Sequence, residues 1–172
     1  MKTRKNVAGG SARQGPDGQS AGRIKTKVMF IRKQGKTKLM YFPVTASTAI
    51  AAGSLVAFAS GKLVPATNTV DSFSIVGVLR HTIAATDADY TNERSVEVEV
   101  PVEANVVWYA DVKVGTLATT SVGLYFDLTT ADDGSGVDQS ASLLDICWCT
   151  KFISTTKGEF ILNIGAWGKV KA

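Results

Sequence analysis

The chain has little of the chemistry on which most active sites depend. Its 172 residues include one histidine, His81, and two cysteines, Cys147 and Cys149. The two cysteines are two residues apart in a strand-like run, so their side chains point the same way and are poorly placed to form a disulfide. None of the asparagines begins an Asn-x-Ser/Thr sequence. We therefore expect both cysteines to be small, core-facing hydrophobes, in a protein that is assembled in a reducing environment.

Long hydrophobic runs are also missing. Every apolar stretch is interrupted by Gly, Ser, Thr or a charged residue, so we expect no membrane-spanning helix. The basic residues near the start are not followed by an apolar segment, which argues against a secretory signal. A hydrophobic content of 45% nevertheless suffices for a substantial core, and the length predicts one main domain.

Acidic residues are almost absent from the first forty residues. This segment holds eleven of the nineteen basic residues and one of the fifteen acidic ones, a formal net charge of +10. The other residues hold eight basic and fourteen acidic side chains, a net charge of −6. The basic residues of the segment are Lys2, Arg4, Lys5, Arg13, Arg23, Lys25, Lys27, Arg32, Lys33, Lys36 and Lys38.

Residues 1–23 are rich in Gly and have almost no large apolar side chain, so we expect residues 1–40 to form a flexible basic arm, with a possible strand in KVMFIRK. A basic tail of this kind can bind nucleic acid. However, residues 1–29 contain no aromatic side chain on which bases could stack, and the rest of the chain is acidic. We therefore expect the arm to bind an acidic protein surface, with nucleic acid as the alternative partner.

The residues after position 40 predict an all-β domain, 41–172. Short runs of β-branched and aromatic residues alternate with turn-forming residues, and no helical periodicity occurs. Residues 55–64, LVAFASGKLV, predict a hairpin that turns at Ser60-Gly61. Residues 71–83 have a continuous apolar centre, typical of a strand that is buried on both faces. We predict a small β-barrel or β-sandwich of about eight to ten strands, preceded by the extended basic arm.

A row of carboxylates follows one strand of this domain. In residues 95–109, SVEVEVPVEANVVWY, valines alternate with Glu97, Glu99 and, further on, Glu103. The period of two predicts a buried valine face and a solvated glutamate face. Such neighbours share an open face rather than flank one bond, so they do not resemble a glycosidase pair. We interpret them as a solvated or inter-copy acidic face and hypothesise that they meet Lys25 and Lys27 of an adjacent copy.

No other motif predicts catalysis. His81 lies at the end of a predicted strand, and no G-x-S-x-G sequence accompanies it, so we expect a surface histidine. Gly35-Lys36-Thr37 looks like the end of a phosphate-binding loop, but Phe30 occupies the position of the first glycine. We expect no enzymatic activity and no cofactor.

Two acidic loops carry the oxygen ligands that calcium prefers. They contain Asp87, Asp89 and Glu93, and Asp132, Asp133 and Asp138. Neither loop follows the D-x-D-x-D-G order, so we expect ordinary solvated loops. A bound cation is the alternative in each.

Four segments of the domain resemble the head decoration (cement, or capsid-stabilising) proteins of tailed bacteriophages. They are AAGSLV (51–56), GKLVPA (61–66), IVGV (75–78) and VEVEVPV (96–102). TKFISTTKGEFIL near the C-terminus is similar to the closing hairpin of such domains, and the likeness covers roughly residues 41–165.

The resemblance implies a small β domain that binds the outer surface of an expanded capsid and strengthens contacts between major capsid protein subunits. It implies a homo-oligomer, with a trimer favoured, no cofactor and no membrane. The expected location is the outer capsid surface of a virion assembled in the host cytoplasm. The alternatives are a nucleic-acid-binding β-barrel with a basic tail, and another virion component such as a head fibre base or minor tail protein. The resemblance does not cover the arm.

Overall fold

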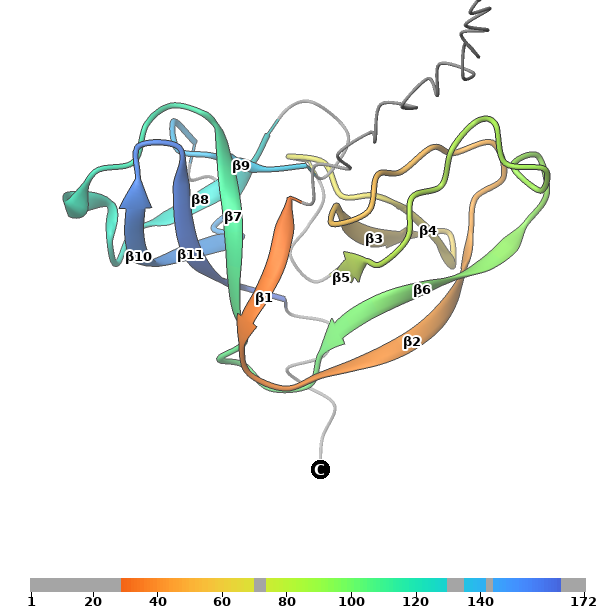
Figure 1. Ribbon diagram of the computed structural model, residues 1–172, viewed down its shortest axis with the longest axis horizontal. Coiled ribbons are helices and arrows are strands. Elements are labelled where there is room, and N and C mark those ends of the chain that lie inside the picture. Colours follow the sequence, from red (N-terminus) through yellow and green to blue (C-terminus); the bar gives the residue numbers. More distant parts are fainter. Residues whose placement is uncertain (1–28, 70–73, 130–134, 142–143, 165–172) are drawn as a thin grey trace, which may run out of the picture.

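The computed structural model describes residues 29–69, 74–129, 135–141 and 144–164 (Figure 1). These residues form eleven strands and one short 3₁₀ helix, which confirms the predicted all-β class. The elements are β1 (Phe30–Gln34), β2 (Thr37–Val44), β3 (Leu55–Ala59), β4 (Lys62–Pro65), β5 (Ile75–Leu79), β6 (Arg94–Pro101), β7 (Val107–Val114), η2 (Thr119–Ser121), β8 (Tyr125–Leu128), β9 (Val137–Asp138), β10 (Cys147–Ser154) and β11 (Lys157–Leu162).

The first barrel is closed in the order β2-β4-β3-β5-β6. The predicted hairpin is confirmed, since β3 and β4 pair from Val56 opposite Pro65 to Ala59 opposite Lys62. Alternation places Val98 of β6 inside the barrel, where it packs with the other interior residues. These include Val44, Ile50, Val56, Leu63, Val76 and Leu79.

A second barrel follows in the chain, where the sequence predicts a single β domain. Its strands run β7-β11-β10-β8-β9, and pairing of β7 with β9 closes it. The predicted closing hairpin is β10 and β11, which pair from Cys147 opposite Leu162 to Ser154 opposite Lys157. The two barrels lie side by side in Figure 1 and bury a common core between them.

That common core explains the apolar centre of the 71–83 segment. All five residues of β5 are buried, as predicted, because one face lines the first barrel and the other packs against the second. Leu55 and Ala57 of β3 also pack against the second barrel, because they belong to one cluster with its Trp108 and Phe160. The barrels are therefore held together by burial of apolar surface that neither could bury alone.

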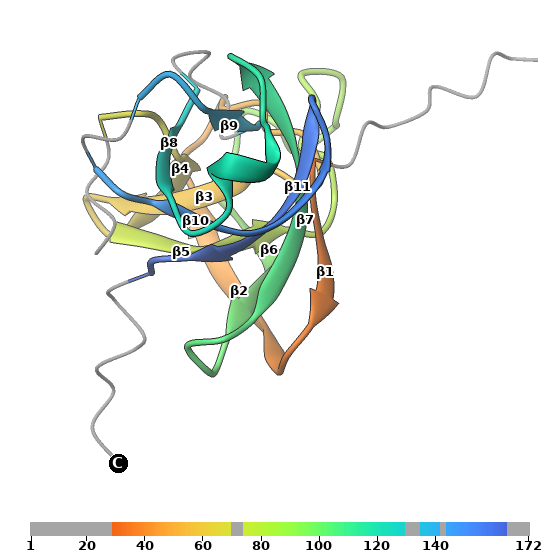
Figure 2. The same cartoon turned by 90° about the vertical axis from the view of Figure 1, so that its left-hand side faces the viewer.

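A continuous two-stranded ribbon connects the barrels. The segment β1–β2 runs antiparallel to β6–β7: β1 pairs with β7 in the second barrel, and β2 pairs with β6 in the first. Figure 1 shows both segments turning together at the lower edge of the molecule, and Figure 2 shows β1 beside β7 from the side.

Gly35 makes this bend possible. Its φ is +95°, a conformation that side chains disfavour, and a Cβ there would lie 2.8 Å from the Cα of Val106. The main-chain N–H of Lys36 then donates to the Glu103 carboxylate over 2.6 Å, and Val102 donates to the Lys36 carbonyl. The bend is thus closed by contacts between both segments of the ribbon.

The domain boundary predicted at residue 40 needs correction, because it falls inside β2. Residues 30–34 and 37–40, assigned to a flexible arm, are strand residues, and Phe30 is 2% exposed. These residues are strands because they pair with β7 and β6, and both of these strands begin more than fifty residues later in the chain. Residues 1–28 of the predicted arm lie outside the described residues.

Candidate functional site

Glu99 is the centre of a polar cluster on the outer face of the ribbon. Its side chain is 5% exposed and accepts hydrogen bonds from Arg32 Nε at 2.5 Å, Thr37 Oγ1 at 2.8 Å and Arg80 at 3.0 Å. The partners come from β1, from β2 and from the residue after β5. One carboxylate therefore connects four strands, including its own, and two guanidinium groups compensate its burial.

The prediction of a solvated glutamate face is wrong for Glu99. Alternation does place it on the outer face of β6, as expected, but Arg32 and Arg80 extend across that face and cover it. Their own side chains are about half exposed, at 45% and 50%. Glu99 is therefore not available to Lys25 and Lys27 of another copy.

The other two predicted carboxylates keep more exposed surface. Glu97 accepts from the Tyr41 hydroxyl at 3.2 Å and lies 3.2 Å from His81 Nε2. The hydrogen bond to Glu97 and its negative charge raise the pKa of Tyr41. His81 is largely exposed, as predicted for a surface histidine. Glu103 belongs to the bend, where it accepts from Lys36 N–H.

Three of the eleven predicted arm cations gather at the bend with free side chains. Lys33, Lys36 and Lys38 are exposed, and no carboxylate among the described residues forms an ion pair with them. Arg32, the fourth that the structure describes, is paired with Glu99. The remaining seven lie outside the described residues: Lys2, Arg4, Lys5, Arg13, Arg23, Lys25 and Lys27.

The acidic loop before β6 is neutralised by basic side chains. Arg94 forms ion pairs with both Asp87 and Asp89, and Lys62 pairs with Glu93. The hydrogen bond from Arg94, with one from the Ala84 main chain, lowers the pKa of Asp87. Within the described ranges no group of three ligand residues could hold a metal ion.

The second acidic loop is described only in part. Asp132 and Asp133 lie outside the described residues, and Asp138 is a buried residue of β9. Its carboxylate accepts from the main chain and the hydroxyl of Ser140. Asp138 is therefore a structural residue of the second barrel.

Cys147 and Cys149 are both buried and free, as predicted. They point into the second barrel from alternate positions of β10, so Trp148 between them points outward. Burial raises the pKa of both thiols, and the nearby Asp127 carboxylate adds to the effect at Cys147. Both groups are therefore unreactive thiols in the folded protein.

Trp148 belongs to an exposed apolar patch that sequence reasoning missed. It stacks on Tyr125, its cross-strand neighbour, with ring centroids 6.3 Å apart, and both side chains are exposed. We call this stacked pair the aromatic patch. The available signal was the alternation around Trp148: with both cysteines in the core, the residue between them has to face outward.

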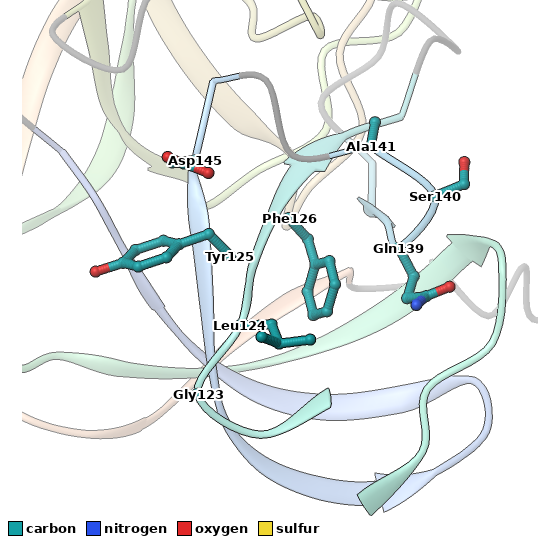
Figure 3. A pocket seen from close by; sticks show the side chains of 8 residues that line it. All are labelled: Gly123, Leu124, Tyr125, Phe126, Gln139, Ser140, Ala141 and Asp145. Carbon is teal, nitrogen blue, oxygen red and sulfur yellow. The ribbon is translucent and has the colours of Figure 1, made fainter. Parts of the chain in front are cut away.

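A hollow of about 390 Å³ adjoins the aromatic patch (Figure 3). Leu124 and Phe126 form its apolar floor, and Gln139, Ser140 and Asp145 supply polar groups. Figure 3 shows the Tyr125 side chain pointing to the opposite side of the strand from Phe126. Asp127 Oδ1 holds the nearby main chain by accepting from the N–H groups of Leu144 and Asp145, at 2.8 and 3.0 Å.

The chain matches no protein-family model, no curated protein and no solved structure. Of the residues described, none belongs to a helix with the length and apolar character needed to cross a membrane.

Proposed function

We propose that this protein is a structural component of a tailed-bacteriophage virion that binds the outer surface of the capsid. In this role it stabilises contacts between major capsid protein subunits, performs no chemistry and acts as a homo-oligomer. The resemblance of segments 51–56, 61–66, 75–78 and 96–102 to head decoration proteins supports the proposal.

The observation that carries the proposal is the anchoring of the basic arm at the seam between the barrels. Phe30 is buried among residues of both barrels, and its N–H donates to the Gly53 carbonyl at 2.9 Å. The next residues pair with β7. A load on the arm is therefore transmitted to the common core rather than to a loop, which suits a protein that has to hold neighbouring subunits together.

Two further features support a binding role. The arm is cationic while the remainder of the chain is acidic, so the two parts favour different surfaces. The aromatic patch is an apolar surface that a partner could cover, and aromatic residues are enriched at the centres of protein interfaces. An arm contact and a patch contact on one particle would reinforce each other through avidity.

The test measures binding to purified expanded heads of the phage that encodes the chain. The first variant replaces the seven arm cations before Met29 by glutamine, which leaves β1 and its pairing intact. The second is Tyr125→Ala with Trp148→Ala. A matched control replaces Lys113 and Lys151, two basic residues of the second barrel, by glutamine. We expect each test variant to bind on the order of tenfold more weakly and the control to bind normally.

Binding to double-stranded DNA over a salt series is the second readout. Weak DNA binding of the unaltered chain at moderate salt is the expected result. Tight DNA binding with a steep salt dependence, lost in the glutamine variant, would favour the nucleic-acid-binding alternative. Electron microscopy of particles with and without the protein locates it: density confined to a fibre base or to the tail would overturn the capsid assignment.

A further inference from the structure

The strand β2 has an open edge. The Lys36 carbonyl, just before β2, accepts from Val102, so Lys38 and every second residue after it in β2 point their main-chain groups at β6. The intervening residues point the other way, as Thr45 shows by donating to Leu63 of β4. However, β4 reaches β2 only at Val44. Among the described residues, the outward N–H and C=O groups of Leu39 and Tyr41 have no partner.

This edge is also apolar. Leu39 is 51% exposed and Tyr41 is 67% exposed, and they are the large exposed apolar side chains of β2. On the other face of the strand, Met40 and Phe42 are only partly buried against the core of the first barrel. Natural proteins normally protect such edges, since unpaired main-chain groups beside apolar side chains attract another strand. A partner strand would form hydrogen bonds with the unpaired main-chain groups and would cover the exposed apolar side chains.

The sequence directly before β1 has strand character. Residues 24–28, IKTKV, alternate apolar or β-branched side chains with Lys25 and Lys27. They directly precede β1, but β1 cannot continue along β7. From Val112 onward, β9 occupies the edge of β7 on which β1 lies. The alternation of residues 24–28 therefore suits a strand, and most of the outer edge of β2 has no neighbouring strand among the described residues.

We propose that residues 24–28 of one copy pair with the open edge of β2 in a second copy. The segment would place Ile24 and Val28 on the side of Met40 and Phe42, and its lysines on the side of Leu39 and Tyr41. On that side, the carboxylate of Glu97 is held at the Tyr41 hydroxyl. Lysine side chains are long enough to lie over the exposed apolar groups while their charge approaches Glu97.

A second copy fits this geometry better than the same chain. Phe30 is fixed at the seam beside Gly53, and β6 lies between the start of β1 and β2 in Figure 1. Val28 lies two positions before Phe30, a span of at most about 7 Å, which is too little to pass around β6 to the far edge of β2. Exchange between copies is head-to-tail, which closes into rings such as trimers. This interaction does not depend on the identity of the capsid partner.

The first test removes one main-chain donor from the edge. Leu39→Pro deletes an outward N–H and leaves the hydrogen bonds to β6 unchanged, and Pro43 shows that β2 accepts proline at such a position. Leu39→Thr is the matched control, because it shortens the side chain but keeps the N–H. By sedimentation velocity we expect roughly tenfold weaker self-association for Leu39→Pro and a much smaller change for Leu39→Thr.

The second test is complementation. Lys25→Pro with Thr26→Pro removes two neighbouring main-chain N–H groups from the arm segment, one of which points to the partner edge in either register. This variant should also weaken self-association by roughly tenfold or more. Mixed one to one, this variant contributes an intact edge and Leu39→Pro contributes an intact arm. We expect the mixture to form dimers that grow no further. Normal self-association of the arm variant alone, or no dimer in the mixture, would overturn the proposal, as would a monomeric unaltered chain.

Covalent trapping covers the case in which Leu39→Pro does not fold. Lys25→Cys or Lys27→Cys in one tagged copy and Leu39→Cys in another should form a disulfide under mild oxidation, because these side chains share a face in the proposed pairing, whereas the same arm cysteines and Val122→Cys should not. The native cysteines are buried and do not compete. Equal yields for both pairs would contradict arm exchange. Particle binding is measured separately, so its failure with normal trapping would count against the capsid role alone.

Discussion

Arg32 Nε lies 2.5 Å from the carboxylate of Glu99, and this pair joins β1, which pairs with β7 of the second barrel, to β6 of the first. Thr37 and Arg80 bind the same carboxylate. The two residues are 67 positions apart in the chain, so the contact exists only because the ribbon bends at Gly35. The polar cluster and the apolar seam thus act on the same junction between the barrels.

Replacement of Glu99 by glutamine should destabilise the protein by about 1–3 kcal/mol. The amide keeps the shape but loses the charge that three donors bind, while Arg32 and Arg80 are exposed enough to regain water. Glu103→Gln is the matched control, because its amide oxygen can still accept from Lys36 N–H. Urea unfolding measures both. If both variants lose the same free energy of unfolding, the charge of Glu99 does not stabilise the protein more than that of Glu103.

Replacement of Gly35 by alanine should cost about 2–4 kcal/mol. The added Cβ would meet the Val106 main chain in a backbone conformation that alanine disfavours. Gly61→Ala is the control: its φ of +78° is also positive, but a Cβ there meets nothing within 4 Å, so we expect about 1 kcal/mol. Thermal or urea unfolding separates the two. A loss at Gly35 no larger than at Gly61 would mean that the bend can relax.

Stability should fall as the pH rises above about 9, partly because of Cys147 and Cys149. Burial raises the pKa of both thiols in the folded state, so the unfolded chain releases protons first and is favoured as the pH increases. Each thiol contributes up to about 1.4 kcal/mol per pH unit above its unfolded pKa. Below that pKa the contribution is constant.

The double variant Cys147→Ala, Cys149→Ala isolates this effect. It should be less stable at neutral pH because of the lost side-chain volume, but its stability should decline less steeply between pH 9 and 10.5. Urea unfolding over this range gives the two slopes. Parallel slopes would contradict the expected deprotonation of the thiols on unfolding. A thiol reagent should also react slowly with the native protein and quickly with the unfolded chain.

Local patterns account for most of the secondary structure. The hairpins at 55–64 and 147–162, the doubly buried strand around Val76 and the inward cysteines all follow from periodicity and turn residues within a few positions. Patterns of this range could not define the start of the folded part. β1 and β2 are strands because they pair with β7 and β6. The last eleven residues of the predicted arm, 30–40, therefore belong to the folded part.

The sequence by itself determined the all-β class, the division of charge between the first forty residues and the rest, and which face of each strand carries which side chains. Only the tertiary structure decided that two barrels form, that Glu99 is buried under Arg32 and Arg80, and that β2 keeps an open edge. Alternation specifies the face of a strand on which a residue lies. What covers that face, or pairs with that edge, depends on residues brought together from distant parts of the chain by burial of the common core.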